Sequence, residues 1–281
     1  MKRQLELIIE DRFKNSCLWK NKIEMDCLSQ KVFFTIRENR IDLYHKGGLL
    51  FSFDQYGYKT HVKFAAVSHL NGIDGDYLTE TTLPKHNLTS AFEPIYHRIK
   101  ENCSKFSKHE ALGVSEIYQK HSFLSVSNVV VLDIEASFES LLEEKYQDRI
   151  DLVLLNKSTM TLQFVEAKHF SNKEILSETT PKVLSQLERY ESQILHRKKE
   201  IISEYGKLVR SLNRIFGLTL PEPIDFDPKV TLLIFGFDDD QKNGRLRKRV
   251  IENPQYKGIK VYAIGKIKDV KPENIWNKKE L

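Results

Sequence analysis

The stretch IDLVLLNKSTMTLQFVEAKH, residues 150–169, decides the fold. Two apolar, strand-like runs flank a polar turn at residues 156–158, and this arrangement predicts a β-hairpin. Because side chains alternate along a strand, Glu166 and Lys168 share one face of the second strand, residues 161–169. Both follow apolar residues on that face, so two charged groups stand at the end of a stripe that is otherwise core.

A carboxylate on the first strand of this hairpin gives the pattern a chemical meaning. Antiparallel pairing across the turn would bring Asp151 toward Glu166. Buried charges are costly unless they are paired or bind a metal, and two carboxylates suit Mg²⁺ or Mn²⁺. Lys168 beside such an ion could orient or help to deprotonate an attacking water, or offset charge on a phosphate. The alternative is an ordinary surface hairpin with a salt-bridging Glu and Lys.

Helical and strand-like patterns on both sides of the hairpin predict one layered domain. The run NVVVLDI, residues 128–134, and the buried run VTLLIFGF, residues 230–237, are strand-like. Apolar residues recur at helical spacing from Phe92 to Ile117, as one long helix or two, and again from about Lys182, with a break expected at Gly206. Pro221 and Pro223 end that second pattern, and a basic helix and the strand KVYAIG follow the run at 230–237. This order predicts an α/β (α+β) architecture in which helices flank a mixed sheet.

The N-terminal part has a different pattern. Residues 31–67 alternate as strands separated by turns and predict an antiparallel meander, whose aromatic residues either form an apolar sheet face or stack on single-stranded bases. Residues 68–90 have the composition of a linker. We therefore expect a β-rich accessory module over residues 1–90 and a second domain over residues 91–281.

Two helical positions strengthen the interpretation of the hairpin as a site. Glu110 occupies a core-facing place in its helix stripe, where an acid is unexpected unless it reaches a metal; a shift of helix register near Gly113 is the alternative. Gln186 and Tyr190 lie four residues apart, so they share one helix face beside the apolar stripe. The glutamine could touch a metal-bound water, and the tyrosine could brace the site; a boundary glutamine beside a half-buried tyrosine is the alternative.

Together these residues resemble the PD-(D/E)xK nuclease superfamily, in particular its RecB-like branch, over residues of about 100 to 265. The matching order is Glu110, Asp151, Glu166-x-Lys168 and Gln186-xxx-Tyr190. The resemblance implies a restriction-endonuclease-like fold and hydrolysis of nucleic-acid phosphodiesters with Mg²⁺ or Mn²⁺. It implies a metal held by Asp151, Glu166, Glu110 and the Ala167 backbone carbonyl, with Lys168 at the water. No proline precedes Asp151, and Glu135 and Glu139 lie nearer to it in sequence than Glu110 does.

Composition sets limits on the class of protein. The 281 residues are 40% hydrophobic and 30% charged, an ordinary globular mixture, with a net charge of +5 that is compatible with a polyanionic partner. No apolar run approaches the length of a membrane span, and the N-terminus is charged where a signal peptide is apolar, so we expect a cytoplasmic protein without a membrane partner. The three cysteines indicate neither a disulfide framework nor a zinc or iron–sulfur site.

Other charged positions have weaker interpretations. The basic cluster at residues 245–249 is a candidate for phosphate contact through Arg245, Arg247, Lys248 and Arg249, as an alternative to a solvated helix face. His169 points to the strand face opposite Lys168 and is expected to be packed or solvated. Asp238, Asp239 and Asp240 are expected to cap the following helix.

The leading functional hypothesis is a nuclease acting on DNA in a restriction, antiphage-defence or repair setting, a setting that rests on the resemblance alone. Two other classes remain open. One is a catalytically silent nucleic-acid-binding or assembly subunit with a nuclease fold. The other is an effector subunit whose N-terminal module binds a protein partner and gates cleavage. A homo-oligomer is compatible with each of these hypotheses.

Overall fold

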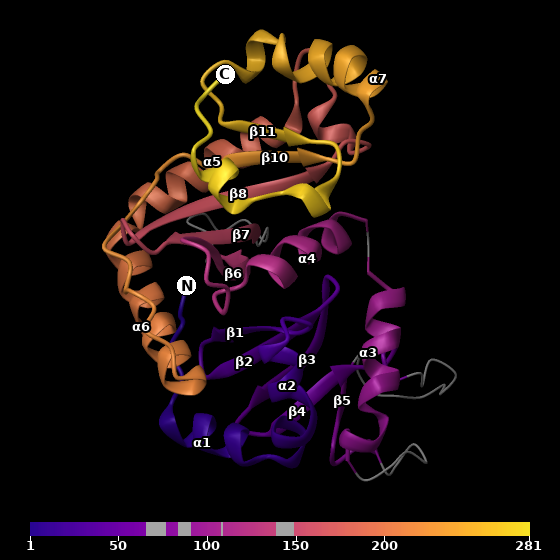
Figure 1. Ribbon diagram of the computed structural model, residues 1–281, viewed down its shortest axis with the longest axis vertical. Helices are drawn as coiled ribbons and strands as arrows, with labels where there is room; N and C mark the ends of the chain where they lie inside the picture. The colour runs from indigo at the N-terminus through magenta and orange to yellow at the C-terminus, as the bar shows by residue number, and fades with distance from the viewer. Residues whose placement is uncertain (66–76, 84–90, 108, 139–148) are drawn as a thin grey trace. The chain divides into compact units, whose positions relative to one another are not determined.

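The computed structural model describes residues 1–65, 77–83, 91–107, 109–138 and 149–281 (Figure 1). The chain forms two compact units. The hairpin unit comprises Met1, Lys120–Gly206 and Leu220–Leu281, and the meander unit comprises Lys2–Gln119 and Lys207–Thr219. The sequence places a boundary near residue 90, whereas the units divide after Gln119, because the helix that follows residue 92 packs on the meander.

The sheet of the meander unit is antiparallel, and its strands follow one another in chain order. They are β1 (Phe33–Arg37), β2 (Arg40–His45), β3 (Gly48–Asp54), β4 (Gly57–His61) and β5 (Tyr77–Thr79). The predicted meander is therefore present, and β4, the last strand described within residues 31–67, ends at His61. Strand β5 lies inside the predicted linker, of which residues 68–76 and 84–90 lie outside the described part of the chain.

Helices also precede the meander, within the residues that were expected to form a β-rich module. They are α1 (Leu7–Asn15), η1 (Trp19–Ile23) and α2 (Glu24–Leu28). Phe13 of α1 is fully buried and contacts the rings of Trp19, Phe34, Phe53 and Tyr58. Phe34, Phe53 and Tyr58 of the meander thus belong to the core of this unit, in agreement with the apolar-face alternative, whereas Tyr56 is exposed.

The helical pattern after Phe92 forms a 3₁₀ turn, η3 (Glu93–Ile95), and two helices, α3 (Tyr96–Lys105) and α4 (His109–His121). Phe92 and Tyr96 contact the ring of Phe51 in β3, which ties this segment to the meander. Phe106 was expected in the buried stripe, but it is 54% exposed because α3 ends one residue before it. Helix α4 approaches the turn between β2 and β3 so closely that a Cβ on Gly47 would lie 2.5 Å from the Ala111 backbone.

The hairpin unit is built on a mixed sheet with the order β11-β10-β8-β7-β6, and β9 pairs with β8. Its strands are β6 (Val129–Ser137), β7 (Arg149–Asn156), β8 (Thr161–His169), β9 (Asp225–Phe226), β10 (Thr231–Phe235) and β11 (Val261–Ile264). The predicted hairpin is confirmed, since β7 and β8 pair antiparallel across the turn. Strand β10 runs parallel to β8 and β11, so the chain has the mixed α+β class that the sequence predicted.

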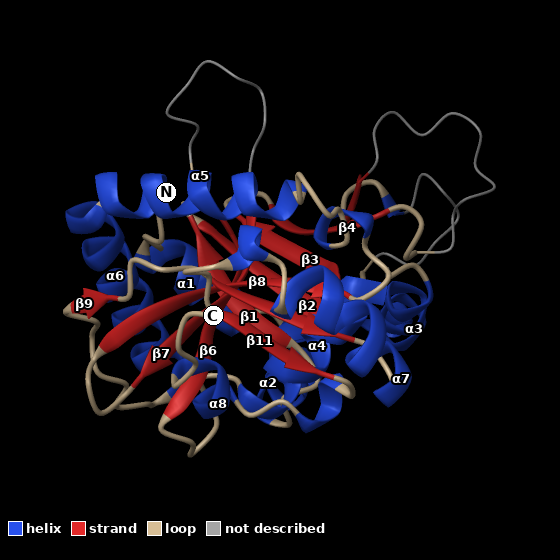
Figure 2. Ribbon diagram, turned by 90° about the horizontal axis from the view of Figure 1, so that it is seen from above, coloured by secondary structure: helices blue, strands red, loops and turns tan. Residues whose placement is uncertain are grey.

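Helices lie on both faces of this sheet, with α5 (Lys182–His196) and α8 (Pro272–Trp276) on opposite sides (Figure 2). The shorter helical segments of the unit are η4 (Lys173–Ile175), α7 (Asp239–Gln241), η5 (Lys242–Ile251), η6 (Pro254–Tyr256) and η7 (Ile267–Asp269). Asp238 caps α7 in a capping box with Gln241, the capping role expected for this acidic run. In the described part of the chain, no helix has the length and hydropathy that a membrane crossing requires.

The predicted helix break at Gly206 is wrong. The break falls at Arg197, and α6 (Lys198–Phe216) continues through Gly206. The apolar stripe continues on both sides of the glycine with Tyr205 and Leu208, both fully buried, and this burial outweighs the roughly 1 kcal/mol that a glycine costs inside a helix.

Candidate active site

The two strands of the hairpin stop pairing where the predicted site begins. The described ladder between β7 and β8 runs from Asn156–Thr161 to Leu152–Val165. One step further along this register, Asp151 stands opposite Glu166. The Asp151 carboxylate, and not a backbone carbonyl, accepts the Ala167 N–H, with 2.7 Å between Oδ2 and the nitrogen. The carboxylate is therefore fixed between the two strands, beside Glu166.

Burial raises the pKa of Asp151 well above its ordinary value, and the neighbouring Glu166 and Glu135 raise it further. The Ala167 N–H and the Lys168 ammonium act in the opposite direction. Two carboxylates that disfavour each other's ionisation share this place, and a divalent cation between them would relieve the repulsion.

Glu166 and Lys168 lie on the same strand face, as the alternation predicts, and 2.8 Å separates Glu166 Oε1 from Lys168 Nζ. The two residues are 2% and 8% exposed, respectively. A second carboxylate oxygen, Oε2 of Glu174 in η4, lies 3.1 Å from the same ammonium. Burial works against the charged form of Lys168, but Glu166 and Glu174 outweigh it and raise the pKa of the ammonium. In this arrangement Lys168 is a cation and not a base.

Gln186 and Tyr190 of α5 form a hydrogen-bonded chain that ends on β7. Gln186 Nε2 donates to the Tyr190 hydroxyl at 2.7 Å, and this hydroxyl donates to the Arg149 carbonyl at 2.8 Å. Tyr190 is fully buried. The helix is thereby joined to the strand two residues before Asp151, so the tyrosine braces the backbone that presents the carboxylate.

Glu135 is a carboxylate near the site that was noted in the sequence only for its proximity to Asp151. It lies on β6 with a φ of +49°, a left-handed conformation that is uncommon outside glycine, and pairs with Arg149 at 3.4 Å. Its effect on the pKa of Asp151 places it in the same electrostatic environment. Glu110 lies on α4 in the meander unit, so its membership of the site stays a prediction, and Glu139 lies outside the described residues.

The oxygen atoms available at this place are of the chemical type that binds a hard divalent cation. Asp151 and Glu166 offer carboxylate oxygens, and Mg²⁺ is commonly held by one or two carboxylates while water and phosphate complete its shell. Within the described residues, no group of three or more His, Cys, Asp or Glu side chains is placed to hold a metal ion. The Ala167 carbonyl, which also belongs to the predicted set, is part of the peptide that follows Ala167 on β8. No family model, curated protein or solved structure matches this chain.

The carboxyl end of β8 also carries His169, on the face opposite Lys168. Its ring packs against Phe235 with 5.5 Å between centroids, and its Nδ1 lies 2.8 Å from the Ser171 hydroxyl. Gly236 has a φ of +83°, and a Cβ there would lie 2.2 Å from the imidazole. The close packing requires a glycine at position 236, and His169 is therefore a packed residue.

The basic cluster forms part of the π-helix η5, and its members differ in their partners. Arg247 pairs with Glu252 at 2.5 Å, and Arg249 pairs with Glu178. Arg245 and Lys248 are exposed. Arg245 and Lys248 are therefore better placed for phosphate contact than Arg247 and Arg249, which form ion pairs with glutamates.

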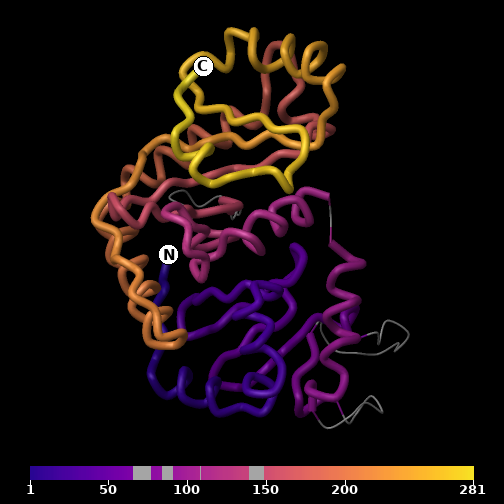
Figure 3. Tube along the Cα trace, in the orientation of Figure 1, coloured from indigo at the N-terminus to yellow at the C-terminus, as the bar shows by residue number. Residues whose placement is uncertain are grey.

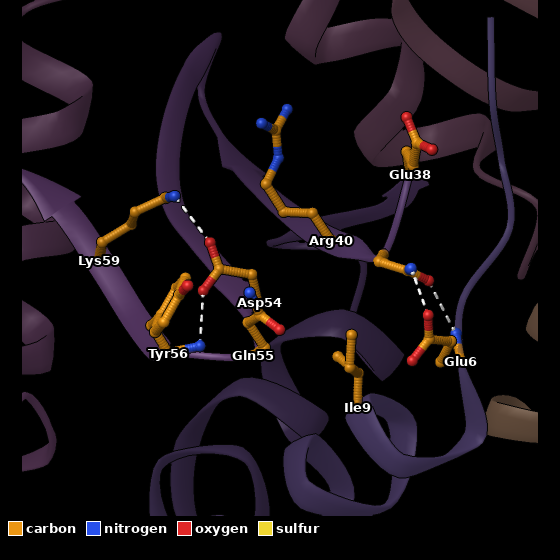
Figure 4. Close-up of a pocket in the computed structure, with 9 residues that line it drawn as sticks. Glu6, Ile9, Glu38, Arg40, Asp54, Gln55, Tyr56 and Lys59 are labelled. Carbon is orange, nitrogen blue, oxygen red and sulfur yellow. Dashed lines mark hydrogen bonds and ion pairs between the residues drawn. The ribbon is translucent and has the colours of Figure 1, made fainter.

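A hollow of about 280 Å³ lies in the meander unit, at the turns between β1 and β2 and between β3 and β4 (Figure 4). Its polar groups bond to one another: Lys59 to Asp54 at 2.8 Å, and Asn39 Nδ2 to Glu6 at 2.6 Å. Tyr56 stands at its rim and is 81% exposed. No predicted site residue lines this hollow, and two of its charged groups pair with residues outside the lining, Glu38 with Lys2 and Arg40 with Asp42.

Proposed function

We propose that the chain is a divalent-metal-dependent nuclease that hydrolyses phosphodiester bonds of nucleic acid, with DNA as the expected substrate. One observation carries this proposal. Asp151 and Glu166 stand side by side at the end of the β7–β8 ladder, and the charged side chain of Lys168 is buried beside them. A structural core gains nothing from two adjacent acids, whereas a phosphodiesterase needs oxygen ligands and a cation at one place.

Each residue has a role in this reaction. Asp151 and Glu166 would hold Mg²⁺ or Mn²⁺, which supplies Lewis-acid polarisation of the phosphate and a more acidic water. The Lys168 ammonium offsets the negative charge that develops on the phosphate, because its two carboxylate neighbours keep it protonated. Tyr190 holds β7 in position through the Arg149 carbonyl, and Gln186 orients the tyrosine hydroxyl.

The order of these residues along the chain supports membership of the PD-(D/E)xK superfamily, and with it a restriction-endonuclease-like fold for the hairpin unit. Asp151 and Glu166-x-Lys168 lie on adjacent antiparallel strands, and Gln186-xxx-Tyr190 lies on the helix that follows. Under this proposal Arg245 and Lys248 contact the phosphate backbone of the substrate, and restriction, antiphage defence or repair is the setting.

The test is a cleavage assay with plasmid DNA, linear DNA, single-stranded DNA and RNA, each with Mg²⁺, Mn²⁺ or EDTA. We expect cleavage with a metal and none with EDTA. Asp151→Asn keeps an oxygen to accept the Ala167 N–H but removes the charge, and we expect it to lower kcat at least about a hundredfold, as should Lys168→Ala. Glu188→Gln, an exposed position on α5, is the matched control and should cleave like the wild type.

The outcomes separate the competing functions. Cleavage that survives Asp151→Asn and Lys168→Ala would show that another site is responsible. Metal-independent binding of nucleic acid without cleavage would favour the silent binding subunit. Cleavage only after addition of a second protein would favour the gated effector. Calorimetric titration with Mn²⁺ tests the ligand set separately, since Asp151→Asn should weaken binding of the ion.

A further inference from the structure

The carboxylate of Glu174 contacts Lys168 from the loop that follows β8. Its Oε2 lies 3.1 Å from the ammonium, on which Glu166 also acts at 2.8 Å. The sequence pattern did not include Glu174, because it lies six residues beyond the strand position of Lys168 and belongs to no strand. The contact joins a predicted site residue to a segment outside the motif.

The loop that carries Glu174 links β8 to α5 and can be followed by its colour on the Cα trace (Figure 3). Contacts along its length hold it in place. Phe170 donates its N–H to the Phe235 carbonyl at 2.7 Å, so the start of the loop is hydrogen-bonded to the neighbouring strand, β10. The Asn172 side chain caps η4 and accepts the Glu174 N–H at 2.9 Å. The Tyr256 hydroxyl donates to the carbonyl of the buried Ile175 at 2.8 Å. Glu174 is therefore presented to Lys168 by a packed segment.

The environment of this ion pair separates it from an ordinary surface pair. The Lys168 side chain is 10% exposed, whereas the Glu174 side chain is 43% exposed. Surface pairs contribute little because both side chains move freely in water, but here the lysine is enclosed. An ammonium has three N–H donors, and the two carboxylates occupy two of them. One donor is left for a water or a phosphate oxygen.

We infer that Glu174 is a positioning residue that holds the Lys168 ammonium with its remaining donor directed toward the substrate phosphate. This inference rests on the proposed nuclease function. Glu166 alone would leave the ammonium free to rotate about one contact, and Glu174 supplies the second fixed point. Orientation of a catalytic cation affects the rate of the chemical step more than the affinity for the substrate.

The experiment compares Glu174→Gln with the matched control Glu188→Gln in the full chain, using two measurements. The first is steady-state cleavage. Glu174→Gln should lower kcat about tenfold and change KM less than about twofold, and in a Lys168→Ala background it should have no further effect. The second is an NMR spectrum of the ¹⁵N-labelled lysine ammonium groups, assigned with Lys168→Arg. In Glu174→Gln the hydrogens of the Lys168 ammonium should exchange with water several-fold faster, whereas Glu188→Gln should leave them unchanged.

The two measurements distinguish the inference from the function on which it rests. If the wild type cleaves no nucleic acid with either metal, the proposed function fails, whatever the spectra show. If the wild type cleaves and Glu174→Gln leaves kcat or the Lys168 signal unchanged, the positioning role is wrong. An equal loss of kcat with Lys168 present or absent also overturns it, because the effect would then not pass through the lysine. A rise in kcat would identify an inhibitory contact and likewise contradict positioning.

Discussion

The two units treat buried carboxylates in different ways. In the meander unit, Asp42 is 1% exposed and is held by the Arg40 guanidinium through two bonds of 2.8 and 2.9 Å, with Arg37 at 3.7 Å. In the hairpin unit, Asp151 has another acid, Glu166, as its neighbour. The meander unit pairs Asp42 with guanidinium groups, and the hairpin unit places Asp151 beside another acid.

This difference indicates which buried carboxylates would be stabilised by a bound cation. A buried acid with a bidentate arginine is complete, and the pair of Glu10 and Arg214 in the meander unit is a second example. At the end of β7 and β8, Asp151 has another acid beside it, and Glu166 and Glu174 share one lysine, Lys168. An excess of negative charge in a partly buried place is stabilised by a cation from solution, so the hairpin unit is the one whose buried charges indicate function.

The largest expected effect is a different response of the two units to removal of one carboxylate charge. Asp42→Asn should lower the free energy of unfolding by about 3 kcal/mol, because two arginines lose their acid. Asp151→Asn should leave this free energy unchanged or raise it when no metal is present, because one of two like charges is removed. Urea unfolding in EDTA measures both. Equal destabilisation by the two variants would contradict the comparison.

An effect of at most similar size is expected from acid in the meander unit, where burial lowers the pKa of His45 from 6.5 to about 4. The nearby Lys100 and Lys46 act in the same direction, while the hydrogen bond to the Lys31 carbonyl and the charge of Asp26 oppose them. Between pH 6.5 and 4, His45 therefore binds a proton in the unfolded chain but not in the folded chain. Stability should fall as the pH drops from 6.5 to 4, by up to about 3 kcal/mol, and no further from this group below pH 4.

Urea unfolding at several pH values checks this, with His45→Asn as the comparison. The asparagine amide can still donate to the Lys31 carbonyl but does not titrate, so the loss of stability between pH 6.5 and 4 should be smaller in the variant by the contribution of His45. An identical pH dependence in both proteins would mean that His45 contributes nothing to it.

Local patterns predicted the hairpin and the central residues of the candidate site. Two-residue alternation and a polar turn together determine which strands pair and which side chains share a face. That alternation put Glu166 and Lys168 on one face, and antiparallel pairing put Asp151 beside Glu166, as the hydrogen bond to Ala167 requires. The helix spacing of Gln186 and Tyr190 likewise predicted a shared face, which their hydrogen bond confirms.

What the sequence did not predict depends on contacts between distant segments. Glu174 reaches Lys168 from a loop that is held in part by Tyr256, a residue far along the chain. Glu135 faces the same environment through a left-handed backbone that its residue type does not favour. The spacing of Leu5, Ile9 and Phe13 was a signal for the helix that precedes the meander, but the surrounding charges concealed it.

The smallest expected effect compares one buried tyrosine hydroxyl in each unit. The Tyr118 hydroxyl accepts the Gly47 N–H at 2.9 Å in the meander unit, and the Tyr190 hydroxyl donates to the Arg149 carbonyl at 2.8 Å in the hairpin unit. Tyr118→Phe and Tyr190→Phe should each lower the free energy of unfolding by about 1 kcal/mol, because each leaves a backbone group without this partner. If the hairpin unit holds the site, only Tyr190→Phe should also lower kcat, since only that hydroxyl supports the strand that carries Asp151. A loss of kcat in Tyr118→Phe as large as that in Tyr190→Phe would show that general stability, and not the support of β7, governs cleavage.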